Sequence, residues 1–209
     1  IWAVFRKTWN ISKTKSMKKL YLIMTAITVA LMSCQTAGIE GQTDLTGNNI
    51  IPRPRSVVST GGSFVLTGRS DIFVMPGSPE EVAVTGSFLA GKLNPSTGLG
   101  LEVITDGSKP GKGDILIAIG EAGAGLGDEG YELVITEKVL TLTAEKPAGL
   151  FRGIQTIRQL LPPEIEADTI QPGPWAIPTG TIRDWPEYGH RGEMLDVSRH
   201  FFGPEDVKR

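Results

Sequence analysis

The residues of this sequence that could bind a polar substrate lie near its end, in Arg191-Gly-Glu-Met-Leu-Asp-Val-Ser-Arg-His-Phe-Phe202. This segment predicts a strand, Glu193–Ser198, that runs into a charged turn carrying Arg199 and His200. A guanidinium offers rigid, forked donors that suit two adjacent oxygens, which a lysine cannot imitate. Position alone, however, favours a structural ion pair of Arg199 with Asp196 or a neighbouring strand over a binding role.

A new helix is expected directly after this turn. Pro204, Glu205 and Asp206 suit a first helical turn, because proline is preformed for that position and the helix dipole favours acidic side chains there. The sequence stops at Arg209, one turn into the helix, where an amphipathic helix has nothing against which to bury its apolar face. We therefore expect the chain to be the front part of a longer protein, stopped where its main domain starts.

The second chemically distinctive residue is Cys34, the only cysteine of the chain. It follows a basic start, Met17-Lys18-Lys19, and an uncharged apolar run, Leu20–Met32, shorter than the ~20 residues that span a bilayer. Leu31-Met32-Ser33-Cys34 resembles a bacterial lipobox, which implies that Cys34 is diacylated and becomes the mature N-terminus. The alternative is a buried free cysteine in a core helix. A lone cysteine also excludes a disulfide framework and a multi-cysteine zinc site.

The N-terminal part of the chain is interpreted accordingly as three segments. Residues 1–16 are an upstream extension, residues 17–34 are a lipoprotein signal peptide, and residues 35–49 are a flexible tether. The tether is polar and rich in Gly and Thr, with no apolar period. These assignments predict a protein anchored by lipid in the bacterial cell envelope, at the outer membrane or its periplasmic face.

The composition is that of an ordinary globular protein, with 40% hydrophobic and 21% charged residues and a formal net charge of −2. There is no polybasic excess outside the N-terminus, so nucleic acid is not an expected partner. The 26 glycines and 14 prolines indicate many turns. We expect no metal and no cofactor.

Residues 50–180 are predicted to form a folded domain of the α+β class, a two-layer antiparallel sheet with two helices on one face. Short apolar or alternating runs predict its strands, and the last two form a hairpin. The predicted strands are Val57-Val58, Phe64–Leu66, Ile72–Met75, Leu101–Ile104, Asp114–Ile119, Tyr131–Ile135 and Val139–Thr143.

Two helices are predicted to cover this sheet. The first starts at Ser78-Pro79, with serine as the N-cap, and stops at Asn94-Pro95. The second runs from about Pro147 to Leu161 and ends before Pro162-Pro163. Each has one apolar stripe at helical spacing: Val82, Leu89 and Leu93 in the first, and Leu150, Ile154, Ile157 and Leu161 in the second.

The glycine-rich run Gly120–Gly127 comes directly after a predicted strand and could suggest a dinucleotide-binding loop. That fingerprint requires a helix immediately afterwards, so that the helix dipole faces the pyrophosphate. Here Gly130-Tyr131 and a hairpin strand come next instead. The sequence therefore favours a flexible surface loop.

Four motifs together identify a family. They are Asp128-Glu-Gly-Tyr-Glu-Leu133, the run Ala148–Pro162, Ile182-Arg-Asp-Trp-Pro186 and the run Arg191–Phe202. In this order and spacing they resemble the β-N-acetylhexosaminidases of glycoside hydrolase family 20. One departure is Glu187-Tyr188, where the family usually has Arg-Phe; we expect altered local packing there and unaltered chemistry.

The resemblance implies a non-catalytic α+β domain over 50–180 and the truncated start of a catalytic (β/α)8 (TIM) barrel over 181–209. The last motif would be the first barrel strand, and Arg199 would bind the 3- and 4-hydroxyls of a terminal N-acetylhexosamine. Residues at the C-terminal ends of barrel strands face the active site, which agrees with this role. Asp196 is interpreted as a buried polar anchor, Arg191 and His200 as supports of the barrel mouth. Trp175 and Trp185 are interpreted as packing residues around the interdomain linker.

The resemblance also implies an exo-acting enzyme that removes terminal N-acetylglucosamine or N-acetylgalactosamine by substrate-assisted retaining hydrolysis. The substrate's acetamido oxygen attacks the anomeric carbon, an Asp orients the acetamido nitrogen, and the adjacent Glu protonates the leaving oxygen. In the family this Asp–Glu pair lies after the fourth barrel strand. Because Glu80-Glu81 and Glu205-Asp206 both start helices, we expect no catalytic residue in this chain and no activity from it alone.

A competing hypothesis comes from another functional class. The chain could be a non-catalytic carbohydrate-binding or scaffold lipoprotein of the cell surface, with its function carried by the α+β domain. That hypothesis fits residues 50–180 but gives no reason for the motif that contains Arg199.

Overall fold

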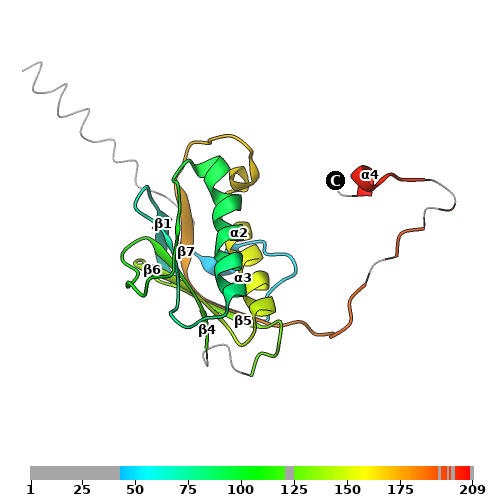
Figure 1. Cartoon of the computed structure of the whole chain (residues 1–209), viewed down its shortest axis with the longest axis horizontal. Coiled ribbons are helices and arrows are strands. Elements are labelled where there is room, and N and C mark those ends of the chain that lie inside the picture. Colours follow the sequence, from blue (N-terminus) through cyan, green and yellow to red (C-terminus); the bar gives the residue numbers. More distant parts are fainter. Residues whose placement is uncertain (1–42, 121–124, 193, 197, 199–200, 208–209) are drawn as a thin grey trace, which may run out of the picture. The chain divides into compact units, whose positions relative to one another are not determined.

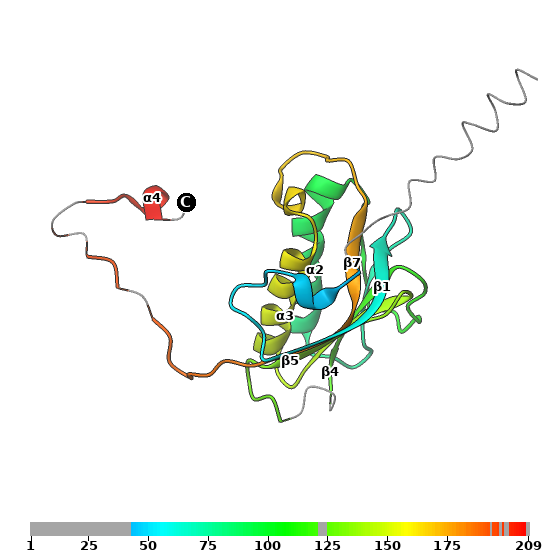
Figure 2. The same ribbon diagram turned by 180° about the vertical axis from the view of Figure 1, so that it is seen from behind.

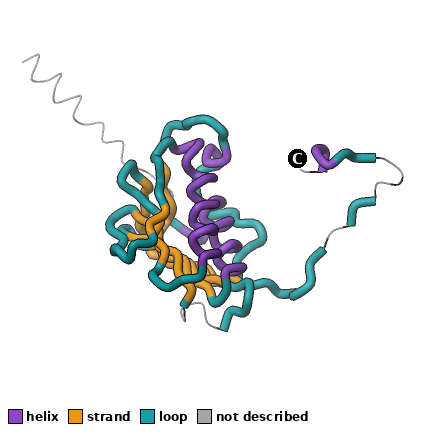
Figure 3. The backbone as a smooth tube through the Cα atoms, in the orientation of Figure 1, coloured by secondary structure: helices purple, strands orange, loops and turns teal. Residues whose placement is uncertain are grey.

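The computed structural model describes residues 43–120, 125–192, 194–196, 198 and 201–207 (Figure 1). In the described residues, one seven-stranded sheet carries two long helices, α2 and α3, side by side on one of its faces (Figures 1 and 3). The elements are η1 (Leu45–Gly47), β1 (Ser56–Leu66), β2 (Ile72–Val74), α2 (Glu80–Thr97), β3 (Val103–Ile104), β4 (Asp114–Ile119), β5 (Tyr131–Ile135), β6 (Val139–Ala144), α3 (Pro147–Leu160), η3 (Pro163–Glu166), β7 (Trp175–Asp184) and α4 (Pro204–Val207).

The sheet has the strand order β1-β7-β5-β6-β4-β2-β3 and is mixed. Strands β1, β7, β5 and β6 pair antiparallel, whereas β6, β4, β2 and β3 pair parallel. A tight hairpin forces β5 and β6 to run in opposite directions, and the crossover through α2 lets β2 and β3 run in the same direction. The predicted α+β class with two helices on one face is confirmed. The expectation of an antiparallel sheet is right for the half from β1 to β6 and wrong for the half from β6 to β3.

Helix α3 agrees closely with the prediction, because its apolar stripe is buried and prolines flank it at both ends. Leu150, Ile154 and Ile157 are fully buried against the sheet. The helix also lies unusually near the strands beneath it. A Cβ added at Gly149 would come within 2.1 Å of the Gly130 carbonyl oxygen, and one at Gly153 within 2.2 Å of Leu142.

Helix α2 differs from the prediction at both ends. Its predicted stripe, Val82, Leu89 and Leu93, is fully buried, but the helix begins at Glu80, with Pro79 as N-cap and no side-chain cap. It also continues through Pro95 to Thr97 and ends at Gly98, whose φ of 64° only glycine adopts readily. The prediction that Asn94-Pro95 stops the helix is therefore wrong.

Strands β1 and β7 are the two largest departures from the predicted strands. The two short runs expected around Val58 and Phe64 are one bent strand, β1, whose pairing with β7 shifts register between Ser59 and Ser63. Strand β7 was not predicted. It occupies an interior position of the sheet between β1 and β5, and Trp175, its first residue, is buried, which places this tryptophan inside the domain and not at a linker.

The domain also extends beyond its predicted limits. Leu45, expected in a flexible tether, is only 1% exposed, and its backbone N–H donates to the Ser59 hydroxyl at 3.1 Å. At the other end β7 reaches Asp184, across the expected boundary at residue 180. The tether prediction is therefore wrong for the described residues 43–49, because η1 packs against β1 and β7.

The turn before β5 agrees with the rejection of a dinucleotide site. Residues 121–124 lie outside the described residues, and the next described stretch contains a turn in which the Gly130 N–H donates to the Gly127 carbonyl at 3.1 Å. Strand β5 then starts at Tyr131. A strand in this place supplies no helix dipole to a pyrophosphate.

The C-terminal segment carries the helix that was predicted, α4, but not the predicted strand. Among residues 193–198, the described positions 194–196 and 198 are not in a strand. Strand hydrogen bonds require a neighbouring strand, and the sheet of the described residues provides none for this segment. Asp196, expected to be buried, is exposed, and its carboxylate accepts the Ser198 N–H at 2.8 Å. No helix among the described residues is long and apolar enough to cross a membrane.

Candidate functional site

The predicted site residues Arg199 and Cys34, together with His200, lie outside the described residues. The described segment Trp185–Arg191, which leaves the end of β7, precedes Arg199 in the sequence. This exit segment runs along an open groove of about 610 Å³. The groove is lined by the incoming chain before β1, the first residue of β5, one side of α3 and the exit segment itself: Ile50–Arg53, Arg55, Glu129, Tyr131, Arg152, Gln155, Thr156, Gln159, Asp184–Tyr188 and Arg191.

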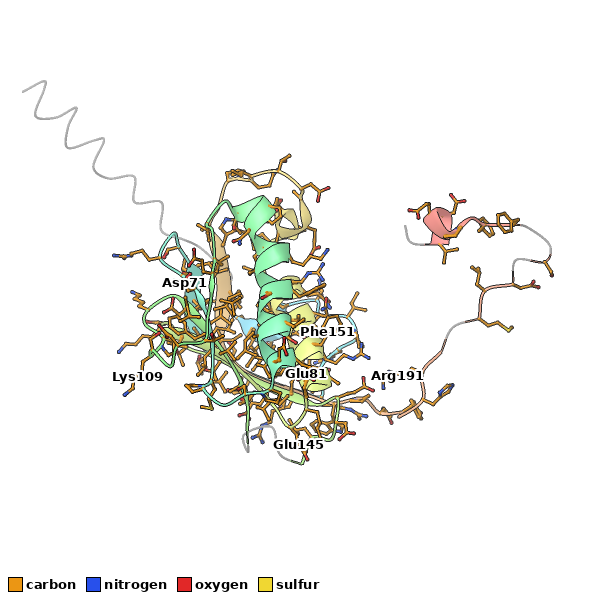
Figure 4. All side chains as sticks on the ribbon, in the orientation of Figure 1. Asp71, Glu81, Lys109, Glu145, Phe151 and Arg191 are labelled. Atoms are coloured by element: carbon orange, nitrogen blue, oxygen red, sulfur yellow. The ribbon has the colours of Figure 1, made fainter. Side chains whose placement is uncertain are left out.

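Glu129 is the charged centre of this groove. One of its carboxylate oxygens accepts the Nε and Nη2 hydrogens of Arg152 on α3, at 2.9 and 2.8 Å, and also pairs with Nη2 of Arg191 on the exit segment. Arg191 is labelled in Figure 4, where it lies on the segment after β7. The Arg152 and Arg191 guanidiniums hold the pKa of Glu129 below its ordinary value, mainly through the hydrogen bond from Arg152.

Arg55, just before β1, holds the exit segment at a second point. Its guanidinium pairs with the Glu187 carboxylate at 2.9 Å and lies over the Trp185 ring, 5.7 Å from the centroid. Its backbone N–H also donates to Asp184 at 3.2 Å. Burial raises the pKa of Asp184, and the hydrogen bonds from Arg55 and Trp185 only partly offset this effect. Glu187, one of the two departures from the family motif, thus has an ion-pair partner.

Two neutral contacts fix the walls of the groove. The Gln159 side chain on α3 accepts the Ile51 N–H at 2.8 Å and donates to the Ile51 carbonyl at 3.0 Å, which fastens the incoming chain to the helix. At the base, the Tyr131 and Thr156 hydroxyls share a buried hydrogen bond of 2.5 Å. Burial raises the pKa of Tyr131 to about 12, so the phenol stays neutral over the physiological range.

Asp128-Glu129 is the only Asp–Glu dipeptide in the sequence and therefore has to be weighed as a catalytic pair. A general acid in glycoside hydrolysis needs a raised pKa to hold its proton at neutral pH. The pKa of Glu129 is displaced in the opposite direction by its two arginines. Glu129 is therefore engaged in ion pairing and lacks the raised pKa of a general acid.

The other acidic pairs also agree with the sequence-based expectation. Glu80 and Glu81 occupy the first turn of α2, and Glu205 and Asp206 the first turn of α4. Among the described residues, no three His, Cys, Asp or Glu side chains are grouped so that they could hold a metal ion. The polar contacts described in the groove are ion pairs and hydrogen bonds between chain segments.

Sequence reasoning missed Glu129 and Arg152 as members of this site, although both lie in motifs that carried the family resemblance. The sequence did offer a signal: one motif, Asp128–Leu133, contains acidic residues, and the later motifs contain arginines that could pair with them. Arg191 was predicted to support the mouth of the barrel, which stays a prediction; among the described residues it pairs with Glu129.

The fold and the groove define a class of protein domain. It is an α+β domain that holds the segment Trp185–Arg191 by ion pairs, with no catalytic acid identified among the described residues. Comparison with known proteins makes the class specific. Residues 47–185 match the family model described as glycosyl hydrolase family 20, domain 2, so the chain belongs to this family.

Named relatives agree with the assignment. The chain is 35% identical over 183 residues to a beta-hexosaminidase of Porphyromonas gingivalis, covering 87% of this chain and 23% of the relative. It is 35% identical over 161 residues to a beta-N-acetylhexosaminidase of Cellulomonas fimi, covering 76% and 30%. Among solved structures, the beta-N-acetylhexosaminidase of Streptomyces coelicolor A3(2) matches with 46% identity and a TM-score of 0.66, over 76% of this chain and 31% of that one. The chain thus spans about a quarter to a third of the length of these relatives.

Proposed function

We propose that this chain is the N-terminal part of an exo-acting β-N-acetylhexosaminidase. The observation that carries the proposal is the family 20 match over residues 47–185, together with 35% identity to a named beta-hexosaminidase over 87% of the chain. The substrates would be glycans that end in N-acetylglucosamine or N-acetylgalactosamine. A mutant of a Streptomyces plicatus beta-hexosaminidase, 44% identical to this chain, has been solved in complex with the product GlcNAc.

In this proposal the α+β domain is non-catalytic and Arg199, at the start of a catalytic (β/α)8 barrel, is the substrate ligand that this chain contributes. Its forked donors would bind the 3- and 4-hydroxyls of the terminal sugar. Hydrolysis would proceed with retention, through attack by the substrate's own acetamido oxygen. The Asp–Glu pair that this route needs has no counterpart among the described residues, since Glu129 is held by arginines.

A direct test compares the 209-residue chain with the complete gene product on an aryl β-N-acetylglucosaminide. We expect turnover only from the complete product, and we expect Arg199→Lys in it to lower kcat/KM by about tenfold or more. Turnover by the 209-residue chain would refute the non-catalytic assignment, and an unchanged kcat/KM would refute the role of Arg199. Glycan binding without hydrolysis by either protein would favour the carbohydrate-binding lipoprotein.

We also propose that Cys34 carries a lipid that anchors the protein in the bacterial cell envelope. The support is the basic start, the short apolar run and the lipobox-like Leu31–Cys34. Cells grown with a clickable palmitate analogue should label the wild-type protein and not the Cys34→Ser variant. Equal labelling of both, or labelling of neither, would remove the proposal.

A further inference from the structure

The feature that carries a further inference is a carboxylate shared by two distant segments. Glu129 precedes β5, Arg152 lies on α3, and Arg191 lies beyond the end of β7, 62 residues from Glu129. All three side chains meet at a single carboxylate oxygen, Oε2 of Glu129. The contact therefore joins the folded domain to the segment that leads to Arg199.

Most surface ion pairs contribute little, because two flexible side chains must be ordered in a solvent of high dielectric constant. This one differs because its domain side is fixed by backbone packing. Gly149 on α3 approaches the Gly130 carbonyl so closely that a Cβ would lie 2.1 Å away. The backbones that carry Arg152 and Glu129 are thereby held against each other, and the Glu129 side chain is only 26% exposed. The Glu129 carboxylate is also bound by Arg152, so less of its conformational freedom remains to be lost when it pairs with Arg191.

The exit segment is itself shaped to meet this carboxylate. Nη1 of Arg191 donates to the Tyr188 carbonyl at 2.7 Å, which closes a short loop within the segment, while Nη2 reaches Glu129. The pair between Arg55 and Glu187 restrains the same segment a few residues earlier. Two successive contacts fix both the position and the direction of the chain as it leaves the domain.

We propose that Glu129 is a positioning residue: by bridging Arg152 and Arg191 it sets the path of the exit segment and so places Arg199 for substrate binding. The part that concerns Arg199 rests on the proposed function. The part that concerns the exit segment stands on the described contacts alone. The experiment therefore needs two readouts, one of which does not depend on activity.

The first readout is hydrogen–deuterium exchange of the 209-residue chain, followed in peptides that cover residues 186–192. Glu129→Gln keeps the shape of the side chain and removes its charge, and Arg191→Gln removes the guanidinium. Each should accelerate exchange in this region about two- to fivefold, and the double variant should add little to either. Glu166→Gln is the matched control, because it breaks another ion pair of α3, Arg158–Glu166, that does not contact the exit segment. Unchanged exchange in the Glu129 variant, or an equal effect of the control, would overturn the proposal.

The second readout is steady-state hydrolysis by the complete gene product. Misplacing a sugar-binding arginine weakens substrate binding, so Glu129→Gln should raise KM about three- to tenfold with a smaller change in kcat, while Glu166→Gln should leave both unchanged. A lowered melting temperature with an unchanged KM would show a purely structural role and overturn the placement of Arg199. An inactive wild-type product would refute the proposed function, and the exchange experiment would still decide whether Glu129 anchors the exit segment.

Discussion

Two parts of the molecule are held in place by different means. The layer formed by α3, β5 and β6 is held by close packing. Apolar side chains such as Leu142 and Ile154 are buried in it, and the backbones of Gly149 and Gly130 are in direct contact. The exit segment Trp185–Arg191 is held by exposed or half-exposed ion pairs. Close packing tolerates almost no change in volume, whereas ion pairs at a surface tolerate change and respond to salt. We therefore expect the packed layer to determine the stability of the domain, and the exit segment to determine the direction in which the chain leaves it.

The largest effect should come from adding a methyl group to the closely packed layer. Gly149→Ala places a Cβ against the Gly130 carbonyl, which cannot move without shifting the start of β5. We expect it to lower the free energy of unfolding by roughly 2–4 kcal/mol in urea titrations. Gly91→Ala on the exposed side of α2 is the matched control, because nothing lies within 4 Å of its Cβ and the helix should gain up to ~1 kcal/mol. Equal effects of the two substitutions would contradict the role assigned to close packing.

An intermediate effect should appear in alkali. Burial raises the pKa of Tyr131 to about 12 from 10.0, so the phenol stays protonated in the folded chain when the unfolded chain has ionised. The contribution of Tyr131 to the free energy of unfolding is therefore fully present below pH 10. It falls as the pH rises towards 12, by roughly 2–3 kcal/mol in total. Tyr131→Phe should lack this loss.

The measurement is urea unfolding of the wild type and of Tyr131→Phe at pH 9, 10 and 11. At pH 9 the variant should be the less stable protein, by about 1 kcal/mol, because it leaves Thr156 without its hydroxyl partner. The difference should shrink as the pH rises. Tyr188→Phe, at a tyrosine that is 71% exposed, is the matched control. Parallel profiles for wild type and Tyr131→Phe would contradict the prediction.

The smallest effect on stability should come from the exit segment. Arg55→Gln removes the pair with Glu187 and the contact with Trp185, yet the Arg55 and Glu187 side chains are 37% and 62% exposed. We expect less than about 1 kcal/mol of destabilisation, and less again in 0.5 M salt. Amide exchange in residues 185–188 should nevertheless rise relative to the wild type. A loss of stability as large as that of Gly149→Ala would erase the distinction between the two parts.

The elements predicted well from the sequence are those whose pattern is local. Helix α3 has an apolar stripe and proline at both ends, and the β5–β6 hairpin alternates around a short polar turn. Strand directions in the other half of the sheet were not predictable in this way. The apolar run of β4 is the same whether its neighbours are parallel or antiparallel, because direction depends on the connections.

Strand β7 was missed for a physical reason that the structure makes visible. Pro178 lies within it, and a proline normally argues against an interior strand because it cannot donate to a neighbour. Here the irregular stretch of β1 between Ser59 and Ser63 lies opposite Pro178 to Gly180. The Thr179 hydroxyl accepts the Gly62 N–H at 2.8 Å, so a side chain replaces part of the lost ladder.

The site was predictable only in outline. The motifs that contain Glu129, Arg152 and Arg191 could be recognised, but not that they meet, because side chains 23 and 62 residues apart become neighbours only through the packing of α3 on the sheet. Arg199 and Cys34 remain predictions. Their positions in motifs are informative, and their surroundings lie outside the described residues.

The meeting of the incoming and outgoing chain has a consequence for how this domain could be shared between proteins. Strands β1 and β7 lie side by side (Figure 2). They pair from Ser56 opposite Arg183 to Leu66 opposite Trp175, and Arg55 contacts Asp184 directly. A domain whose two ends come together can be inserted into or removed from a host chain without a linker that spans its width. Here the two ends lie side by side, and the ion pairs of Arg55 and Glu129 hold the chain at the point where it leaves the domain.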